Sequence, residues 1–174
     1  ISFPRHTRYW HNYLATRLVN GFFFFIPLFV SLSALHQIDS SLVLLLLVLI
    51  WAADSGAYFV GRAIGKNKLL PNVSPGKTTE GVAGGALFSL GAMFAYVSFG
   101  FENATFVQYF FYGVLSLIVT LASILGDLFE SLHKRVAGVK DSGVLLPGHG
   151  GLFDRIDSLT ASAPIFFLAY GFLT

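Results

Sequence analysis

Five long apolar runs divide the chain, and polar or charged residues are concentrated between them. The runs lie near residues 18–35, 41–60, 82–99, 105–125 and 158–174. A helix needs about 20 mostly apolar residues to cross a bilayer, and each run is close to that length. Runs such as 41–50 do not alternate polar and apolar residues as the strands of a membrane β-barrel do. The pattern therefore predicts an all-α, polytopic integral membrane protein with about five transmembrane helices.

Composition excludes a water-soluble globule, because 55% of the residues are hydrophobic and only 11% are charged, against about 25% charged in soluble domains. A length of 174 residues fits one domain, and we expect a single membrane-embedded domain over residues 1–174. The absence of Cys excludes disulfides, thiolate metal ligands and a cysteine nucleophile. The net charge of +2 gives no support for a nucleic acid partner.

The basic residues all fall on one side of the predicted membrane. Five spans place residues 1–17, 61–81 and 126–157 together, and these segments hold all 11 Lys and Arg residues of the chain. The turns at 36–40 and 100–104 hold none. The positive-inside rule then predicts that the basic segments are cytoplasmic loops.

The first apolar run follows a basic stretch and also resembles a secretory signal, with a tolerable cleavage sequence at Ser31-Leu-Ser-Ala34. We expect a retained helix, because only an uncut span places Arg5, Arg8 and Arg17 on the same side as the other basic loops.

Asp54 lies inside the second apolar run, where an acid is costly and usually faces a partner or a cavity. Helical spacing puts Asp54, Tyr58, Gly61 and Arg62 on one stripe. The stripe is consistent with a simple pair between Asp54 and Arg62, or with the lining of a site. We favour the site, because the stripe leads into a basic loop.

The loop that follows contains Gly-Lys-Thr at 76–78, as in part of a P-loop, but Pro71 stands where the first glycine is needed and no strand precedes it. What remains is a Ser-Pro-Gly turn at 74–76 that presents Lys77 at a helix start, where backbone N–H groups favour an anion. An ordinary loop with a helix cap from Thr78 or its neighbour fits equally well.

Residues 126–158 hold the densest polar pattern. If the fourth helix continues past its apolar run, one face carries Asp127, Glu130, Ser131, Lys134 and Arg135. The glycine-rich stretch at 147–151 exposes backbone N–H groups to a phosphate, and Asp154 and Asp157 share a face where the fifth helix begins. A loop whose acids only neutralise its bases would not need acids at the hydrocarbon boundary on three helices.

Carboxylates without Cys or a histidine cluster suit Mg²⁺, which takes one or two carboxylates and completes its shell with water and phosphate oxygens. The candidate ligands are Asp54, Asp127, Asp154 and Asp157. Basic side chains and glycine-rich backbone are the usual surroundings of a phosphate in transfer. The residues therefore predict a Mg²⁺-dependent, cytoplasm-facing site that handles phosphates at the membrane surface.

The polar segment resembles the signature of the phosphatidate cytidylyltransferases, also called CDP-diglyceride synthetases. It reads Ser131-x-x-Lys134-Arg135-x4-Lys140-Asp141, then Pro147-Gly148-His149-Gly150-Gly151-x-x-Asp154-Arg155-x-Asp157. An earlier block with Asp54, Gly61-Arg62 and Ser74-Pro-Gly-Lys77-Thr78-x-Glu80-Gly81 is also similar. The resemblance covers roughly residues 45–174. Members usually carry more N-terminal spans, so the chain looks like the catalytic C-terminal part of such a protein or a shortened member.

The resemblance implies the reaction of CTP with phosphatidate to give CDP-diacylglycerol and pyrophosphate in phospholipid biosynthesis. It implies a homodimer in the bacterial inner membrane, with Mg²⁺ bound and a second cation left open. Asp127 and Asp154 become the first metal ligands, with Asp157 and Asp54 as further ligands or their partners. The implied catalytic set is Asp127, Asp154, Asp157, Lys134, Arg135 and Lys140. The implied substrate-binding set is Arg62, Ser74, Lys77, Thr78, Ser131, Asp141, His149, Gly150, Gly151 and Arg155.

Three alternatives compete with this interpretation. A CTP-dependent kinase of lipid alcohols such as polyprenol or phytol would attack the γ-phosphorus and release CDP. A CDP-alcohol phosphotransferase is disfavoured because its Asp-Gly-x-x-Ala-Arg motif is absent. An anion transporter would show repeated halves and broken helices at mid-membrane, whereas here the charges gather on one side.

Overall fold

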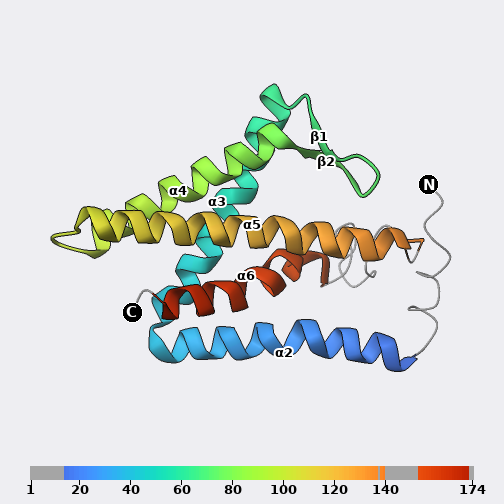
Figure 1. Cartoon of the computed structure of the whole chain (residues 1–174), viewed down its shortest axis with the longest axis horizontal. Helices are drawn as coiled ribbons and strands as arrows, with labels where there is room; N and C mark the ends of the chain where they lie inside the picture. The colour runs from blue at the N-terminus through green and yellow to red at the C-terminus, as the bar shows by residue number, and fades with distance from the viewer. Residues whose placement is uncertain (1–13, 137, 140–152, 173–174) are drawn as a thin grey trace.

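The computed structural model describes residues 14–136, 138–139 and 153–172. Within these ranges the chain forms five long helices and one small β-hairpin (Figure 1). In chain order the elements are α2 (Leu14–Ile38), α3 (Ser40–Ile64), β1 (Lys68–Leu70), β2 (Ser74–Thr78), α4 (Thr79–Gly100), α5 (Phe106–Val136) and α6 (Phe153–Gly171).

Four of the described helices are long and apolar enough to cross a membrane: α2 from Gly21 to Ile38, and the whole of α3, α4 and α5. These helices match the first four predicted spans, apart from residue 105, and confirm the prediction of an all-α polytopic membrane protein. α6 is a helix of 19 residues over the fifth predicted run, and its crossing of the bilayer stays a prediction.

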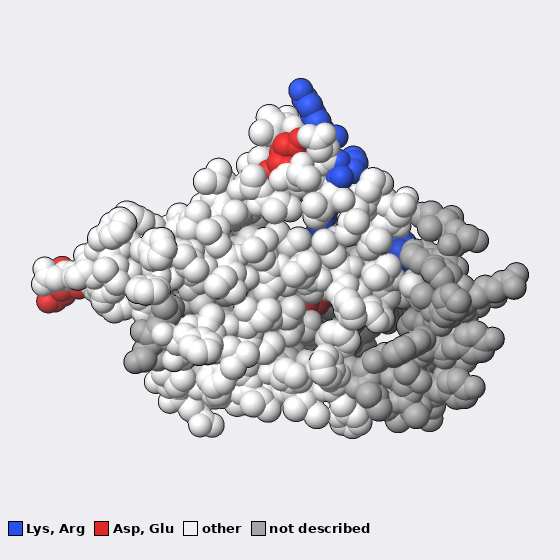
Figure 2. All heavy atoms as spheres, viewed as in Figure 1, with Lys and Arg blue, Asp and Glu red and all other residues white. Residues whose placement is uncertain are grey.

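The helix ends separate into two groups (Figure 1). The beginning of α2, the hairpin, the end of α5 and the beginning of α6 lie toward one end of the molecule, and the turns α2–α3 and α4–α5 lie toward the other. On the face shown in Figure 2, Lys and Arg atoms lie over the hairpin and near the end of α5, with acidic atoms beside those of the hairpin, whereas the α4–α5 turn shows acidic atoms and no basic ones. This arrangement agrees with the predicted segregation of basic residues.

The core joins all five described helices. Leu35 of α2, Leu46 of α3, Met93 of α4, Val119 of α5 and Phe166 of α6 are almost completely buried and belong to one hydrophobic cluster. Because hydrocarbon is as apolar as leucine, such packing stabilises the bundle through close contact rather than through exclusion of water.

Glycines allow α3 and α4 to pack closely. A Cβ atom on Gly56 would lie 2.6 Å from the carbonyl oxygen of Gly84, and one on Gly84 would collide with the side chain of Val60. Small residues that let two backbones approach are typical of membrane helix pairs. This pair fixes the start of α4, and with it the strand β2, against the end of α3.

The hairpin was not predicted. β1 and β2 are antiparallel, with Lys68 opposite Thr78 and Leu70 opposite Ser74. The prediction of a turn at 74–76 is therefore wrong. These residues lie in β2, and the chain turns at 71–73. Pro75 is tolerated because every strand of a two-stranded sheet has an unpaired edge.

The structure confirms the helix cap that the sequence left open. Thr78 is the N-cap of α4, and its hydroxyl oxygen accepts a hydrogen bond from the backbone N–H of Gly81 at 3.1 Å. The side chain is buried. Its hydroxyl thus satisfies the helix start, which explains the threonine without any ligand.

Candidate functional site

Asp127 lies where the hairpin meets α5. The helix continues to Val136, as predicted, and carries Asp127 and Ser131 on one face. The Lys77 ammonium of β2 lies 2.5 Å from Oδ2 of Asp127. The Ser131 hydroxyl donates to Oδ1 of the same carboxylate at 3.3 Å. Both oxygens of Asp127 are therefore held, one of them by a cation from a different element.

Two further acids approach Asp127. One carboxylate oxygen from each of Asp127, Glu130 and Asp157 lies within 4.8 Å of the other two. The start of α6 reaches α5 here because Gly126 has no side chain: a Cβ atom at Gly126 would lie 2.8 Å from the carbonyl oxygen of Asp157. We call Asp127, Glu130 and Asp157 the acidic cluster. The predicted convergence of acids from separate helices is thus present for Asp127 and Asp157.

Glu130 is the member of the acidic cluster that the sequence did not single out as a ligand. Its side chain is only 3% exposed, and its Oε2 lies 2.6 Å from the ammonium of Lys134, one helical turn further along. Its spacing of three residues from Asp127 and four from Lys134 was the available signal. Because a buried carboxylate is costly without a cation nearby, Lys134 offsets part of the cost of burying Glu130.

The acidic cluster carries excess negative charge. Asp157, which precedes the apolar run at 158–174, accepts a hydrogen bond from the backbone N–H of Ser158 at 2.6 Å. Burial and the neighbouring carboxylate of Asp127 nevertheless raise the pKa of Asp157 to about 6. Like charges this close disfavour ionisation of both groups, so a divalent cation between them would stabilise the carboxylate forms.

Asp54 lies beside the acidic cluster rather than within it. It lines a cavity of about 220 Å³ together with Tyr58, Lys77 and Thr78, and the charges of Lys77 and Asp127 both act on it. The alternative pair between Asp54 and Arg62 is not what the structure has, since Arg62 donates to the hydroxyl of Tyr58 at 2.8 Å. Asp54 thus lines a cavity, and its place in a functional site and its role as a metal ligand stay predictions.

The structure describes the surroundings of some of the other predicted site residues and not of the rest. Arg135 donates from Nε to the carbonyl oxygen of Val73 at 3.4 Å, which ties the end of α5 to the hairpin. Ser74 begins β2, three residues before Lys77. Asp154 and Arg155 belong to α6, but their side chains lie outside the described part of the chain. The residues wholly outside it are Lys140, Asp141, His149, Gly150 and Gly151.

The donor set fits a hard divalent cation. The acidic cluster offers only carboxylate oxygens, which suit Mg²⁺, Mn²⁺ or Ca²⁺ rather than a metal that prefers sulfur or imidazole. Lys77 and Lys134 lie beside the cluster and are suited to hold the oxygens of a phosphate. The arrangement can therefore bring a cation and a polyphosphate together at one end of a membrane protein.

Fold and site together define an integral membrane protein whose helices bring carboxylates and lysines to the end that carries the basic loops. Residues 4–173 match the cytidylyltransferase family, and the chain belongs to it. It is 45% identical to a phosphatidate cytidylyltransferase of Haemophilus influenzae, over 99% of this chain and 63% of that protein. It is 43% identical to the Pseudomonas aeruginosa phosphatidate cytidylyltransferase, over 95% of this chain and 61% of that protein.

A phosphatidate cytidylyltransferase of Bacillus subtilis is 41% identical over 80% of this chain and 51% of its own length. The chain thus spans between about half and about three fifths of these relatives. The comparisons confirm the resemblance seen in the motifs, and they disfavour the transporter alternative.

Proposed function

We propose that this chain forms the cytidylyl-transfer site of a phosphatidate cytidylyltransferase. In the reaction, an oxygen of the phosphatidate phosphate forms a bond to the α-phosphorus of CTP, and the bond from that phosphorus to the β-phosphate bridging oxygen breaks. The products are CDP-diacylglycerol and pyrophosphate, which departs with the electron pair of the broken bond.

The observation that carries this proposal is the approach of Lys77 and the acidic cluster from three elements. β2 supplies Lys77, α5 supplies Asp127 and Glu130, and α6 supplies Asp157. Two polyanions must be brought together for this reaction, and oriented cationic groups reduce the cost of doing so. A site built on rigid helices at the membrane boundary suits a lipid headgroup that meets a soluble nucleotide.

The candidate site residues have distinct roles in this proposal. The acidic cluster would hold Mg²⁺, with Asp154 and Asp54 as further candidate ligands. When bound, the cation neutralises charge that develops on the phosphate oxygens of CTP. Lys77 and Lys134 lie next to those ligands and hold phosphate oxygens, and Ser131 keeps the Asp127 carboxylate oriented. Arg135, Lys140 and Arg155 supply further positive charge.

No strong general base is needed in this proposal. A phosphate monoester has a second pKa near 6, so the attacking oxygen of phosphatidate is largely deprotonated at neutral pH. The residues of the site therefore orient the two substrates and balance charge, and they do not remove a proton. A lipid-alcohol kinase would instead need a base for its uncharged hydroxyl.

The site is proposed to face the cytoplasm of a bacterial inner membrane. The support is the concentration of all Lys and Arg residues in the segments on its side, together with relatives from bacteria. Association into a homodimer is a further expectation, from the family resemblance alone.

The reaction can be tested with two positions of label in CTP. The chain is purified, reconstituted in lipid and incubated with phosphatidate, Mg²⁺ and CTP labelled at either the α- or the γ-phosphate. Label from the α-position should enter the lipid fraction, and label from the γ-position should be recovered as pyrophosphate. The variant Asp127→Asn serves as the negative control.

The same experiment separates the alternatives. Transfer of the γ-label to a lipid alcohol, with release of CDP, would identify a kinase and overturn the proposal. Failure to transfer either label, in a preparation that remains folded and monodisperse, would also overturn it for this chain.

A further inference from the structure

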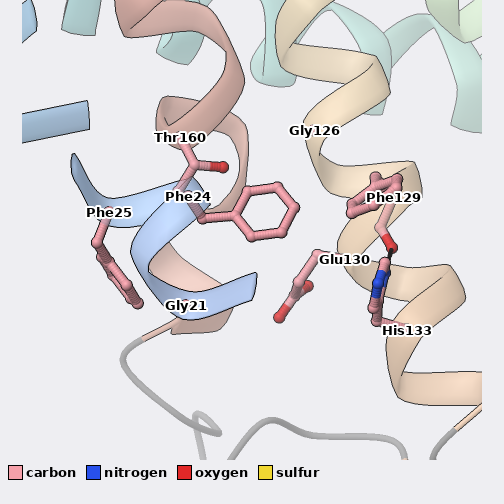
Figure 3. A pocket seen from close by; sticks show the side chains of 8 residues that line it. All are labelled: Gly21, Phe24, Phe25, Gly126, Phe129, Glu130, His133 and Thr160. Carbon is pink, nitrogen blue, oxygen red and sulfur yellow. Dashed lines mark hydrogen bonds between the residues drawn. The ribbon is translucent and has the colours of Figure 1, made fainter. Parts of the chain in front are cut away.

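An apolar cavity of about 250 Å³ lies between α2, α5 and α6, on the side of α5 that faces α2 (Figure 3). Its walls include Phe24 and Phe25 of α2, Phe129 of α5 and Thr160 of α6. The proposed transfer of CMP does not use any of these four side chains. The cavity is large enough to hold a slender ligand and is smaller than the pockets that enclose whole drug-sized molecules.

The cavity has an aromatic wall that two helices share. The ring centroids of Phe24 and Phe129 are 5.3 Å apart, and the His133 ring lies 4.2 Å from that of Phe129. His133 is oriented by a hydrogen bond between its Nδ1 and the carbonyl oxygen of Phe129 at 2.9 Å. In Figure 3 the ring of Phe24 points into the space between α2 and α5.

The cavity reaches the hydrocarbon-facing surface. Phe25 and Phe129 line it and are also 37% and 45% exposed, so residues of the cavity wall also belong to the outside of the bundle. In a protein whose α2 and α5 can span the bilayer, the cavity lies at the ends of these helices that carry the basic loops, so that outside is the edge of the acyl-chain region next to the headgroups. A ligand with a hydrocarbon tail can therefore occupy the cavity without leaving an apolar environment.

Glu130 connects this cavity to the acidic cluster. It lines the cavity, belongs to the cluster with Asp127 and Asp157, and pairs with Lys134. Figure 3 shows its carboxylate in the space between α2 and α5. A molecule with a phosphate at one end and an apolar tail at the other would fit both parts. Its phosphate would lie beside the acidic cluster, and its tail would lie in the cavity.

We propose that this cavity receives part of an acyl chain of the phosphorylated lipid substrate. The proposal rests on the proposed function, because it assigns a place to the lipid end of that reaction. The ribose and triphosphate of a nucleotide would find few polar partners in this apolar cavity, whereas a hydrocarbon chain packs well against its three phenylalanine rings. The cavity then orients the lipid, so that its phosphate meets Lys77 and the acidic cluster.

Gly21 provides a direct test. It lines the cavity, and a Cβ atom added there would meet no atom within 4 Å, so the backbone at this position leaves room for a side chain to begin. Gly91 of α4 has the same free space and lies outside the cavity lining. The substitutions Gly21→Leu and Gly91→Leu are therefore matched in chemistry and in helix propensity.

Activity is measured in mixed micelles with varied dioleoyl-phosphatidate and varied CTP. We expect Gly21→Leu to raise the KM for the lipid about tenfold, the size of effect that one side chain exerts in an apolar pocket. The KM for CTP should stay unchanged, and Gly91→Leu should behave as the unaltered protein. Gly21→Ala, which adds the least volume, should raise the KM for the lipid less and in the same direction.

A second measurement does not depend on catalysis. Phosphatidate with a photoreactive diazirine near the end of one acyl chain should crosslink to peptides of α2 and α5 that contain Phe24, Phe25 or Phe129. The crosslinks should be lost in Gly21→Leu and retained in Gly91→Leu. Equal lipid KM values and equal crosslinks in the two leucine variants would overturn the acyl-chain proposal.

The two proposals fail separately. If the unaltered chain transfers no CMP but shows the crosslinks that Gly21→Leu removes, the proposed function fails and the lipid cavity stands. If CMP is transferred with the same lipid KM in every variant and no crosslink maps to α2 or α5, the function stands and the cavity proposal fails.

Discussion

The ammonium of Lys77 and the carboxylate of Asp127 form an ion pair of 2.5 Å between β2 and α5, 50 positions apart in the sequence. Both side chains are partly exposed, at 26% and 30%, so the pair can be reached by a soluble molecule. A fully exposed pair would contribute little to stability. The pair is better understood as part of a site, in which one cation and one candidate metal ligand are held side by side.

Replacement of Asp127 should abolish turnover with little effect on folding. Asp127→Asn keeps the shape of the side chain but removes a charge from the acidic cluster. We expect kcat to fall about 100-fold or more, equivalent to about 3 kcal/mol of lost transition-state stabilisation. The measurement is CMP transfer by protein that elutes as a single species in detergent.

Asp39 offers a matched control for that experiment. It is an exposed acid that caps α3 by accepting a hydrogen bond from the backbone N–H of Ser41 at 2.8 Å, and this bond lowers its pKa. Asp39→Asn should preserve the cap, because Asn and Asp are equally good at this position, and should leave activity unchanged. Full activity in Asp127→Asn would remove Asp127 from the metal site.

Replacement of Glu130 should change the Mg²⁺ requirement of the reaction more than the KM values for the substrates. Glu130→Gln keeps the volume of a side chain that is 3% exposed while it withdraws one carboxylate from the acidic cluster. We expect the Mg²⁺ concentration for half-maximal activity to rise about 10- to 100-fold, as when a supporting ligand is lost. Mn²⁺ binding followed by electron paramagnetic resonance gives a readout that is independent of turnover.

The control for Glu130 is Glu102→Gln, in the exposed turn between α4 and α5. Its cation requirement should match that of the unaltered protein. If Glu130→Gln also needs no more Mg²⁺ than the unaltered protein, the Glu130 carboxylate is only a partner for Lys134.

The helices and the meeting of Asp127 with Asp157 could be predicted from the sequence, and the hairpin could not. Apolar length determines a membrane helix, and helical spacing determines which face a residue takes, so α5 and its polar face follow directly. The strands at 68–70 and 74–78 are short, and Pro75 opposes strand formation, so local propensity gives no signal for them. Glu130 was missed because spacing places it on the right face but cannot show that α6 approaches that side.

Lys77 should contribute to phosphate binding or to the transition state. Lys77→Ala leaves the Asp127 carboxylate without its cation, and we expect kcat/KM for CTP to fall between about 10- and 100-fold, as when one oriented charge is removed from such a site. Lys68→Ala, on the other strand of the same hairpin and exposed, tests whether any hairpin lysine has this effect. Equal loss in both variants would mean that Lys77 contributes only general positive charge.

Glu80 is expected to position the hairpin. Its carboxylate accepts hydrogen bonds from the backbone N–H of Asn67 at 3.2 Å and from the side-chain amide of Asn67 at 2.8 Å. Loss of this lock should let β2 move and should misplace Lys77. We expect Glu80→Ala to lower kcat about tenfold, the scale at which a small misplacement begins to matter. Asn67→Ala should lower it less, because the backbone N–H of residue 67 still donates to Glu80.

The double variant distinguishes positioning from independent roles. Because the side chain of Asn67 acts only through Glu80 in this lock, removing both should cost little more than Glu80→Ala alone. Additive losses would contradict the lock. Glu80→Gln, which retains an acceptor oxygen, should recover part of the activity.

The close packing of α3 on α4 should be the most sensitive feature of the fold. A Cβ atom on Gly84 would collide with Val60, and the backbone oxygen of Gly56 lies 2.8 Å from the same position, so no rotamer can relieve the clash. Gly84→Val should therefore lower the midpoint of thermal unfolding in detergent by several degrees, because overpacking costs about 1–3 kcal/mol. Gly91→Val introduces the same β-branched residue into the same helix at a position with free space, and its midpoint should stay close to that of the unaltered protein. Since β2 leads directly into α4, Gly84→Val should also reduce activity at temperatures where the protein is still folded, whereas equal midpoints for the two valine variants would show that the helices can separate without cost.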